Sequence, residues 1–277
     1  MIRMIVSDLD DTLLDPRSEL SPRTREALRA AVAAGARVTF ATGRMRESSR
    51  PLAEAVGVNA PLILYNGALV QDLRTDRVVS RLDIPAETAR RICRLAEDMG
   101  VYMQAYPGEG YYCARRCVHT ERYASSIRID ALETPGHQPL SEWISSSQAK
   151  LLALGEAEDM PPVLEAFRRT FAGEGVDFFM SRPAYLEIVS SRASKRNALR
   201  ALAESLNVAP EEILAFGDGE NDAGMLEYAG QGYAMANARE DVRRRARFVA
   251  PSNAEDGAAQ VVEALLAKGE IGRGNAR

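Results

Sequence analysis

Two acidic residues follow the first apolar run of the chain. Residues 2–7 are apolar and partly β-branched, which is typical of a strand covered on both faces, and Asp8 and Asp10 come directly after them. In an extended chain, side chains two residues apart point the same way, so these two carboxylates can share one face. Close carboxylates repel one another, and both remain ionised only when a cation lies between them. The pair is therefore a candidate metal site.

A second strand-like run ends on groups that suit a bound oxyanion. Residues 36–41 are followed by Thr42-Gly43-Arg44, just before a predicted helix. The Thr42 hydroxyl and the unpaired backbone N–H groups at a helix start can donate to an oxyanion such as phosphate. Thr42 could instead simply cap that helix, so alone it is a weak signal.

A third strand-like run, residues 213–216, leads into a loop of acids and glycines. The loop, Gly217-Asp218-Gly219-Glu220-Asn221-Asp222, offers oxygen ligands for a hard cation on a tight turn. Lys195 opens the predicted helix before this strand, where it could meet anionic charge or lie on the helix surface.

The elements that must position these groups alternate between strand and helix at both ends of the chain. Expected strands are residues 2–7, 36–41, 61–65, 213–216 and 232–235, and expected helices are 22–34, 46–56, 195–206, 223–228 and 255–267. Parallel crossovers of this length predict an α/β fold with a doubly wound, Rossmann-like parallel sheet. In such a sheet, chemistry takes place outside the carboxyl ends of the strands, where all three segments lie.

The middle of the chain has a different pattern. A hairpin is expected at 67–70 and 77–82, followed by helices at 85–99 and 161–171 and strands at 101–106, 111–114, 149–155, 176–180 and 185–189. We therefore expect an α/β core formed by residues 1–82 and 190–277, interrupted by an inserted α+β module at 83–189. The tail from Gly269, rich in glycine and arginine, is expected to be frayed.

The predicted sheet edge carries a large excess of negative charge. Six carboxylates gather there, and Lys195 and Arg44 are the obvious cations to offset them: Asp8, Asp10, Asp11, Asp218, Glu220 and Asp222. Such an edge is hard to stabilise without a divalent metal. Mg²⁺ fits best, because it takes a few carboxylates, keeps waters and accepts phosphate oxygens.

Composition narrows the classes of protein. The chain has 277 residues, of which 46% are hydrophobic and 27% charged, and this excludes a disordered chain. The formal net charge of −4 disfavours nucleic-acid binding, and no apolar stretch is long enough to span a bilayer. The odd, sparse set of cysteines predicts a cytoplasmic protein with reduced thiols. Cys113, Cys117 and His119 form a small cluster, but their spacing is a poor match to a zinc site.

These motifs together resemble a known family. The segments Asp8-Leu9-Asp10-Asp11-Thr12-Leu13, Thr42-Gly43-Arg44, Lys195 and Gly217-Asp218-x-x-Asn221-Asp222 are similar, in order and spacing, to the four motifs of the haloacid dehalogenase-like (HAD) phosphatases. Tyr65-Asn66-Gly67-Ala68 and the position of the inserted module resemble the Cof-type subgroup, class IIB, in which the insertion is a cap domain.

The resemblance implies a mechanism on residues of this chain. Asp8 would be the nucleophile that forms an aspartyl-phosphate, and Asp10 would be the general acid and base. Groups that would hold phosphate or substrate are Thr42, Gly43, Arg44, Asn66, Lys195 and Asn221, although Asn66 could also be a plain turn residue. Mg²⁺ would be held by Asp8, the backbone carbonyl of Asp10 and Asp218, with Asn221 or Asp222 in support.

The predicted function is Mg²⁺-dependent hydrolysis of small phosphorylated metabolites, such as sugar phosphates or phosphorylated cofactors. A phosphomutase would use the same four motifs and return the phosphate to its substrate. A phospho-acceptor signalling domain also uses Asp, Thr and Lys at strand ends, but it is shorter and places its acceptor Asp later in the sheet. The expected partner is the small metabolite, with no nucleic acid or membrane, and the expected state is a monomer or homodimer.

Overall fold

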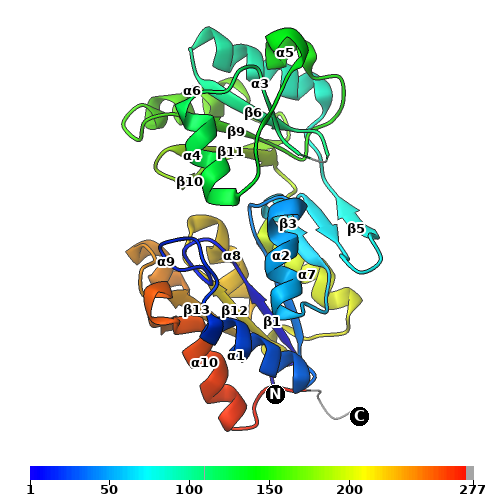
Figure 1. Cartoon of the computed structure of the whole chain (residues 1–277), viewed down its shortest axis with the longest axis vertical. Coiled ribbons are helices and arrows are strands. Elements are labelled where there is room, and N and C mark those ends of the chain that lie inside the picture. The colour runs from blue at the N-terminus through cyan, green and yellow to red at the C-terminus, as the bar shows by residue number, and fades with distance from the viewer. Residues whose placement is uncertain (109, 273–277) are drawn as a thin grey trace. The chain divides into compact units, whose positions relative to one another are not determined.

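The computed structural model describes residues 1–108 and 110–272 (Figure 1). The chain divides into two compact units. Unit 1 comprises Met1–Gly43, Ser49–Val79 and Ser194–Arg277, and unit 2 comprises Arg44–Ser48 and Ser80–Ala193. The limits 83–189 for an inserted domain remain a proposal.

Unit 1 contains a five-stranded parallel sheet in the order β14-β13-β12-β1-β2. Its strands are β1 (Met4–Ser7), β2 (Arg37–Phe40), β12 (Ile213–Gly217), β13 (Gln231–Met235) and β14 (Phe248–Ala250). In the register, Ser7 lies opposite Phe216 on one side and Phe40 on the other, so all three strands end at the same edge. The predicted α/β class with a parallel core sheet is confirmed.

Helices cover both faces of this sheet. They are α1 (Pro22–Ala33), α7 (Lys195–Ser205), α8 (Glu220–Tyr228), α9 (Glu240–Arg245) and α10 (Gly257–Ala267). Side chains of α7 and α8, such as Leu199 and Met225, pack with Met4, Val6 and Ala215 of the strands. Figure 1 shows α1 and α10 side by side in front of the core strands. The sheet is therefore buried on both faces, which explains the continuous apolar runs in its strands.

Two predictions for unit 1 are wrong in detail. The strand expected at 61–65 forms as β3 (Leu62–Leu64), but it belongs to an antiparallel sheet with β4 (Leu69–Gln71) and β5 (Val78–Arg81). It meets the core sheet through one parallel bridge, between Ala41 and Ile63. An apolar run of three residues does not reveal which neighbour it will pair with.

The chain end is also more ordered than expected. Ile271 forms a bridge with Ile2, and the Gly272 N–H donates to the Ile2 carbonyl at 3.0 Å. The expected fraying from Gly269 is therefore wrong as far as residue 272, and residues 273–277 lie outside the described part.

Unit 2 contains a six-stranded sheet in the order β10-β11-β9-β6-β7-β8. Its strands are β6 (Tyr102–Tyr106), β7 (Tyr112–Cys113), β8 (Leu132–Glu133), β9 (Lys150–Leu154), β10 (Val176–Arg182) and β11 (Tyr185–Ser190). Its helices are α3 (Ala86–Asp98), α4 (Val118–Ile127), α5 (Leu140–Trp143) and α6 (Met160–Thr170), and α2 (Arg46–Val56) spans both units. The sequence did not predict α4, because its apolar residues are few and only Thr120, Tyr123 and Ile127 are buried.

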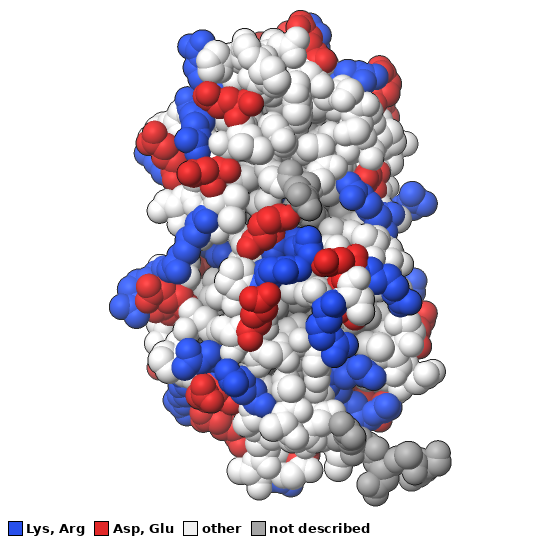
Figure 2. Space-filling model, turned by 45° about the vertical axis from the view of Figure 1, so that its right-hand side comes forward, with Lys and Arg blue, Asp and Glu red and all other residues white. Residues whose placement is uncertain are grey.

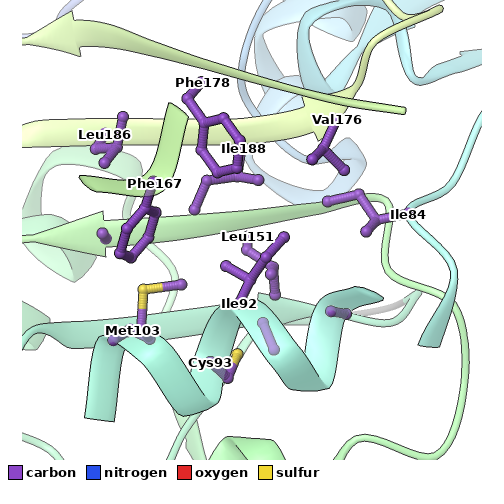
Figure 3. Packing of buried hydrophobic residues seen from close by; sticks show 14 of the residues in the cluster. Ile84, Ile92, Cys93, Met103, Leu151, Phe167, Val176, Phe178, Leu186 and Ile188 are labelled. Atoms are coloured by element: carbon purple, nitrogen blue, oxygen red, sulfur yellow. The ribbon is translucent and has the colours of Figure 1, made fainter. Parts of the chain in front are cut away.

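One face of the unit 2 sheet is apolar. Ile92 and Cys93 of α3 and Phe167 of α6 pack on Leu151 and Ile188 of the strands (Figure 3). The alternating residues on the strands turn to the opposite face, where Lys150 and Glu187 form a buried ion pair of 3.0 Å.

Charged side chains of both signs are interspersed on the face of the molecule shown in Figure 2. In the described part of the chain, every helix is too short or too polar to cross a bilayer.

We predict that Leu151→Ala destabilises the protein by about 2–5 kcal/mol, because it leaves a cavity in the unit 2 core, where Leu151 is fully buried. Leu132→Ala is the matched control: Leu132 lies in the same unit but is 48% exposed, so its loss should change stability by less than about 0.5 kcal/mol. Urea unfolding of the two variants measures the difference. Equal effects would contradict the packing described for this sheet.

Candidate active site

Asp8 lies where β1 meets its neighbour β12. Its backbone N–H donates to the Phe216 carbonyl at 3.0 Å, which continues the parallel ladder by one residue. The Asp8 side chain is nearly buried, and the residue is 7% exposed. The register therefore brings the end of β1 beside the loop that follows β12, as predicted from the sequence.

Lys195 connects two carboxylates of this site. Its Nζ lies 2.7 Å from Oδ1 of Asp8 and 2.6 Å from Oδ1 of Asp222, and its side chain is fully buried. Burial acts to lower the pKa of Lys195, but the carboxylates of Asp222 and Asp8 outweigh it and hold the pKa above its usual value. The lysine is therefore charged, and it is not the surface residue that the sequence left open.

Asp222 holds the loop after β12 in place. Its Oδ2 accepts hydrogen bonds from the backbone N–H groups of Asp218 at 3.1 Å and Gly219 at 3.0 Å. Since Lys195 binds the other oxygen, both oxygens of this buried carboxylate are engaged within the protein. Asp222 thus fixes the position of Asp218 relative to the lysine.

Thr12 is a residue of this site that the sequence analysis missed. Its hydroxyl donates to Oδ1 of Asp218 at 2.7 Å, and it is buried. The signal was present, since Thr12 follows the acids of the first motif, but a threonine in a loop is too common to stand out.

The carboxylates of Asp8, Asp218 and Asp222 form the only group of three or more acidic, His or Cys side chains in the described part of the chain that could hold a metal ion. One oxygen of each lies within 4.8 Å of the others. The alternative cluster of Cys113, Cys117 and His119 is not such a group. An all-oxygen donor set of this kind suits a hard cation such as Mg²⁺.

The electrostatics of the group reflect an excess of negative charge. Burial raises the pKa of Asp8 well above its usual value; Lys195 opposes this, and the carboxylates of Asp222, Asp218 and Asp10 add to it. Burial, and then the Asp222 carboxylate, raise the pKa of Asp218 to about 7. One lysine therefore does not offset the acids gathered here.

Asp10 reaches the site by a different route from the one expected. The chain turns after Leu9, whose carbonyl accepts from the N–H groups of Leu13 at 3.0 Å and Leu14 at 2.9 Å. Asp10 therefore begins a turn, and the extended spacing assumed from the sequence does not apply. The Asp10 carboxylate is still close enough to Asp8 to raise its pKa.

Backbone hydrogen bonds join the ends of β2 and β3. The Thr42 N–H donates to the Ile63 carbonyl at 2.9 Å, and the Thr42 carbonyl accepts from the Asn66 N–H at 2.9 Å. Thr42 is fully buried and precedes the start of α2 by four residues, so it is not that helix's N-cap. The side chain of Asn221 then donates from Nδ2 to Oδ1 of Asn66 at 2.9 Å.

Glu220 is not part of the carboxylate group, and Arg44 makes a contact within unit 2. Arg44 is buried in unit 2, where its guanidinium donates to the Ser126 carbonyl at 3.4 Å. Glu220 is exposed at the start of α8. The backbone carbonyl of Asp11 accepts a hydrogen bond from Asn237 Nδ2 at 2.8 Å. The charge excess thus comes from five of the six predicted carboxylates, since the Asp11 carboxylate also raises the pKa of Asp218: Asp8, Asp10, Asp11, Asp218 and Asp222.

Gly67 allows the loop after β3 to support the start of α7. A Cβ on Gly67 would lie 2.4 Å from the carbonyl oxygen of Ser194, and its φ of +99° is in the region that favours glycine. Ser194 is the N-cap of α7, since its side chain accepts from the Asn197 N–H, and Lys195 is the first helical residue. The loop therefore contacts the backbone that carries the lysine.

We predict that Gly67→Ala lowers the free energy of unfolding more than Gly57→Ala does. Both glycines have positive φ, but nothing lies within 4 Å of a Cβ on Gly57, whereas a Cβ on Gly67 would collide with the Ser194 backbone. The control should cost about 1–2 kcal/mol from backbone strain alone. Urea unfolding of both variants tests this, and equal losses would show that the contact with Ser194 is unimportant.

Comparisons with known proteins agree with this geometry. A family model of haloacid dehalogenase-like hydrolases matches residues 5–262. Phosphatase YwpJ of Bacillus subtilis is 31% identical over 287 residues, covering 96% of this chain and 100% of YwpJ. Pyridoxal phosphate phosphatase YbhA of Escherichia coli is 27% identical over 270 residues, covering 95% and 98%.

A solved structure supports the same assignment. The crystal structure of TM0651 from Thermotoga maritima is similar with a TM-score of 0.82 and 34% identity, covering 95% of this chain and 97% of that chain. The motifs of the sequence, the carboxylate group and these matches lead to one conclusion. The chain belongs to the haloacid dehalogenase-like hydrolases, and it is a phosphatase.

Proposed function

We propose that the protein hydrolyses phosphate monoesters of small metabolites, with Mg²⁺ and through an aspartyl-phosphate on Asp8. The observation that carries this proposal is the buried contact of Asp8 with Lys195, beside Asp218 and Asp222, at one sheet edge. The name of YbhA, a pyridoxal phosphate phosphatase, supports a small phosphorylated substrate. The three free thiols fit a reducing compartment, and we propose a cytoplasmic location.

Asp8 is the nucleophile of the proposed reaction. Lys195 binds its Oδ1, so Oδ2 is the oxygen that attacks phosphorus. A bond forms between Oδ2 and phosphorus while the bond from phosphorus to the ester oxygen breaks. Asp10 gives its proton to the departing oxygen.

The second step returns the enzyme to its starting state. Asp10, now a carboxylate, takes a proton from water, and the water oxygen attacks phosphorus. The bond between phosphorus and Asp8 breaks, which releases inorganic phosphate. The Thr42 hydroxyl, the Gly43 N–H and Lys195 are proposed to hold the phosphoryl oxygens in both steps.

The donor set fits Mg²⁺. The ion would be held by the carboxylates of Asp8 and Asp218 and by the backbone carbonyl of Asp10. Asp222 is left out because both of its carboxylate oxygens are already bound, one by Lys195 and the other by two backbone N–H groups. When bound, Mg²⁺ offsets the negative charge that otherwise keeps a carboxylate away from a phosphate ester. Asp222 is proposed to position Asp218 and Lys195.

We predict that wild-type protein releases phosphate from p-nitrophenyl phosphate with Mg²⁺, and that EDTA abolishes turnover until Mg²⁺ is restored. Asp8→Asn should lower kcat by more than about a thousandfold, because the amide oxygen is a poor nucleophile. Asp241→Asn, which removes an exposed acid on α9, is the matched control and should retain full turnover. Retained turnover in Asp8→Asn would overturn the assignment of the nucleophile.

Product analysis separates hydrolysis from the phosphomutase alternative. With a panel of sugar phosphates, the proposal predicts free phosphate in an amount equal to the dephosphorylated sugar. An isomerised sugar phosphate without free phosphate would instead establish a mutase.

We predict that Asp10→Asn makes the aspartyl-phosphate accumulate. The variant can still be phosphorylated by p-nitrophenyl phosphate, whose leaving group needs little protonation, but it cannot activate water for the second step. Turnover should fall about 10²- to 10⁴-fold. Mass spectrometry of acid-quenched protein should show one added phosphoryl group on the peptide that contains Asp8. Slow turnover with no such adduct would contradict the role given to Asp10.

A further inference from the structure

A cavity lies at the edge of the unit 2 sheet, where the chain returns from α6 to β10. Its volume is about 420 Å³, which is within the range of small-molecule sites. Strand β10 is the outermost strand on this side of the described sheet, and residues 171–175 connect it to α6. The lining of the cavity contains no residue that the proposed phosphatase reaction uses.

Aromatic side chains form part of the lining. Val176 and Phe178 turn to the apolar core of unit 2 (Figure 3), and the alternate residue Phe179 turns to the opposite face of the sheet. Phe171, the C-cap of α6, lines the cavity from the other side. Because lining residues come from both faces of β10, the cavity lies at the edge of the strand, where it is partly open to solvent.

Arg168 gives the cavity a cation in a fixed position. Its Nε and Nη2 both donate to the Phe178 carbonyl, at 3.2 and 2.9 Å, and these two bonds hold the guanidinium against the strand. Among the described residues its only ion pair is with Glu165, whose Oε1 lies 3.9 Å from Nη1. That distance is too long for a hydrogen bond, so the N–H groups of Nη1 are available to an anionic oxygen.

Asp177 gives the same cavity the opposite charge. Partial burial raises the pKa of its carboxyl group, and Arg168 opposes this only in part. Within the described part of the chain, Arg168 is the one charged group that acts on this carboxyl group, and the two are not in ion-pair contact. A carboxylate that is partly removed from water and lacks a paired cation is stabilised by a bound ammonium group.

We propose that this cavity binds a free aromatic α-amino acid. The carboxylate of the amino acid accepts from Nη1 of Arg168, and its ammonium group donates to Asp177. Its ring lies against Phe171 and Phe179, because aromatic rings pair favourably with one another. The inference concerns unit 2 alone and does not depend on the phosphatase function.

The arrangement of the two charges favours this class of ligand. Arg168 and Asp177 are close enough to act on one another but are not paired, as is needed to receive two opposite charges separated by a single carbon atom. A simple anion would meet the carboxylate of Asp177, and a simple cation would meet the guanidinium, so each is disfavoured by one side of the site.

NMR titration of the ¹⁵N-labelled full chain tests the proposal with L-phenylalanine and two analogues that each lack one charge. Hydrocinnamate lacks the ammonium group, and phenethylamine lacks the carboxylate. L-Phenylalanine should shift the backbone amides of Gly173 and Asp177, which line the cavity, with a dissociation constant of about 1 mM or lower. Each analogue should bind at least about tenfold more weakly.

Two variants separate the two contacts. Asp177→Asn should weaken binding of L-phenylalanine about tenfold and should not weaken binding of hydrocinnamate, which has no ammonium group. Arg168→Gln should weaken binding of L-phenylalanine about tenfold and should not weaken binding of phenethylamine. Asp98→Asn and Arg169→Gln are the matched controls, since both residues are exposed and lie outside the lining, and they should leave all three affinities unchanged.

Any of three results would overturn the inference. The first is that L-phenylalanine causes no saturable shift of the Gly173 amide in the wild type. The second is equal affinity for L-phenylalanine and hydrocinnamate, which would make this a site for simple anions. The third is equal affinity for L-phenylalanine and phenethylamine, which would make it a site for simple cations. If Arg168→Gln fails to fold, the analogues on wild-type protein and the exposed Asp177→Asn change still decide the question.

Discussion

The site depends on one buried interaction, the double contact of Lys195 with Asp8 and Asp222. A lysine taken out of water is costly unless it is paired, and these two carboxylates pair it at 2.6–2.7 Å. The same interaction leaves the site negative, because Asp218 and Asp10 remain in the field of Asp8 after the lysine is counted. A cation is therefore the natural complement of the site, and an anionic ester can approach only when that complement is present.

The fold builds this arrangement with short connections. Parallel pairing of β1 with β12 brings Asp8 beside the loop of Asp218, and no longer-range adjustment is needed. Asp222 then connects the loop after β12 to Lys195. Thr12 connects the same loop, through Asp218, to the loop after β1. Each of these residues lies within a few positions of the end of a strand or helix. The rigid elements therefore set the geometry of the site, and preorganised catalysis requires such rigidity.

Much of this could be predicted from the sequence, and the reason is topological. Acids and a lysine placed directly at strand and helix ends must meet when the sheet is parallel, so Asp8, Asp218 and Lys195 could be predicted from the sequence alone. Helix α2 was predicted at its observed limits, Arg46–Val56. What failed depends on tertiary contacts: the sheet that β3 joins, the helix α4 with its few apolar residues, and the turn that replaces extended chain at Asp10. The hydrogen bond between Asn66 and Asn221 joins residues 155 positions apart, and no local pattern encodes it.

The most direct test of the central claim is a crystal structure of the protein grown with Mn²⁺ in place of Mg²⁺, with the ion located by its anomalous scattering. We expect a single ion bound by carboxylate oxygens of both Asp8 and Asp218, at about 2.1 Å, with the contacts of Lys195 to Asp8 and Asp222 retained. An ion bound elsewhere, or a site in which Asp8 and Asp218 share no ion at saturating Mn²⁺, would contradict it.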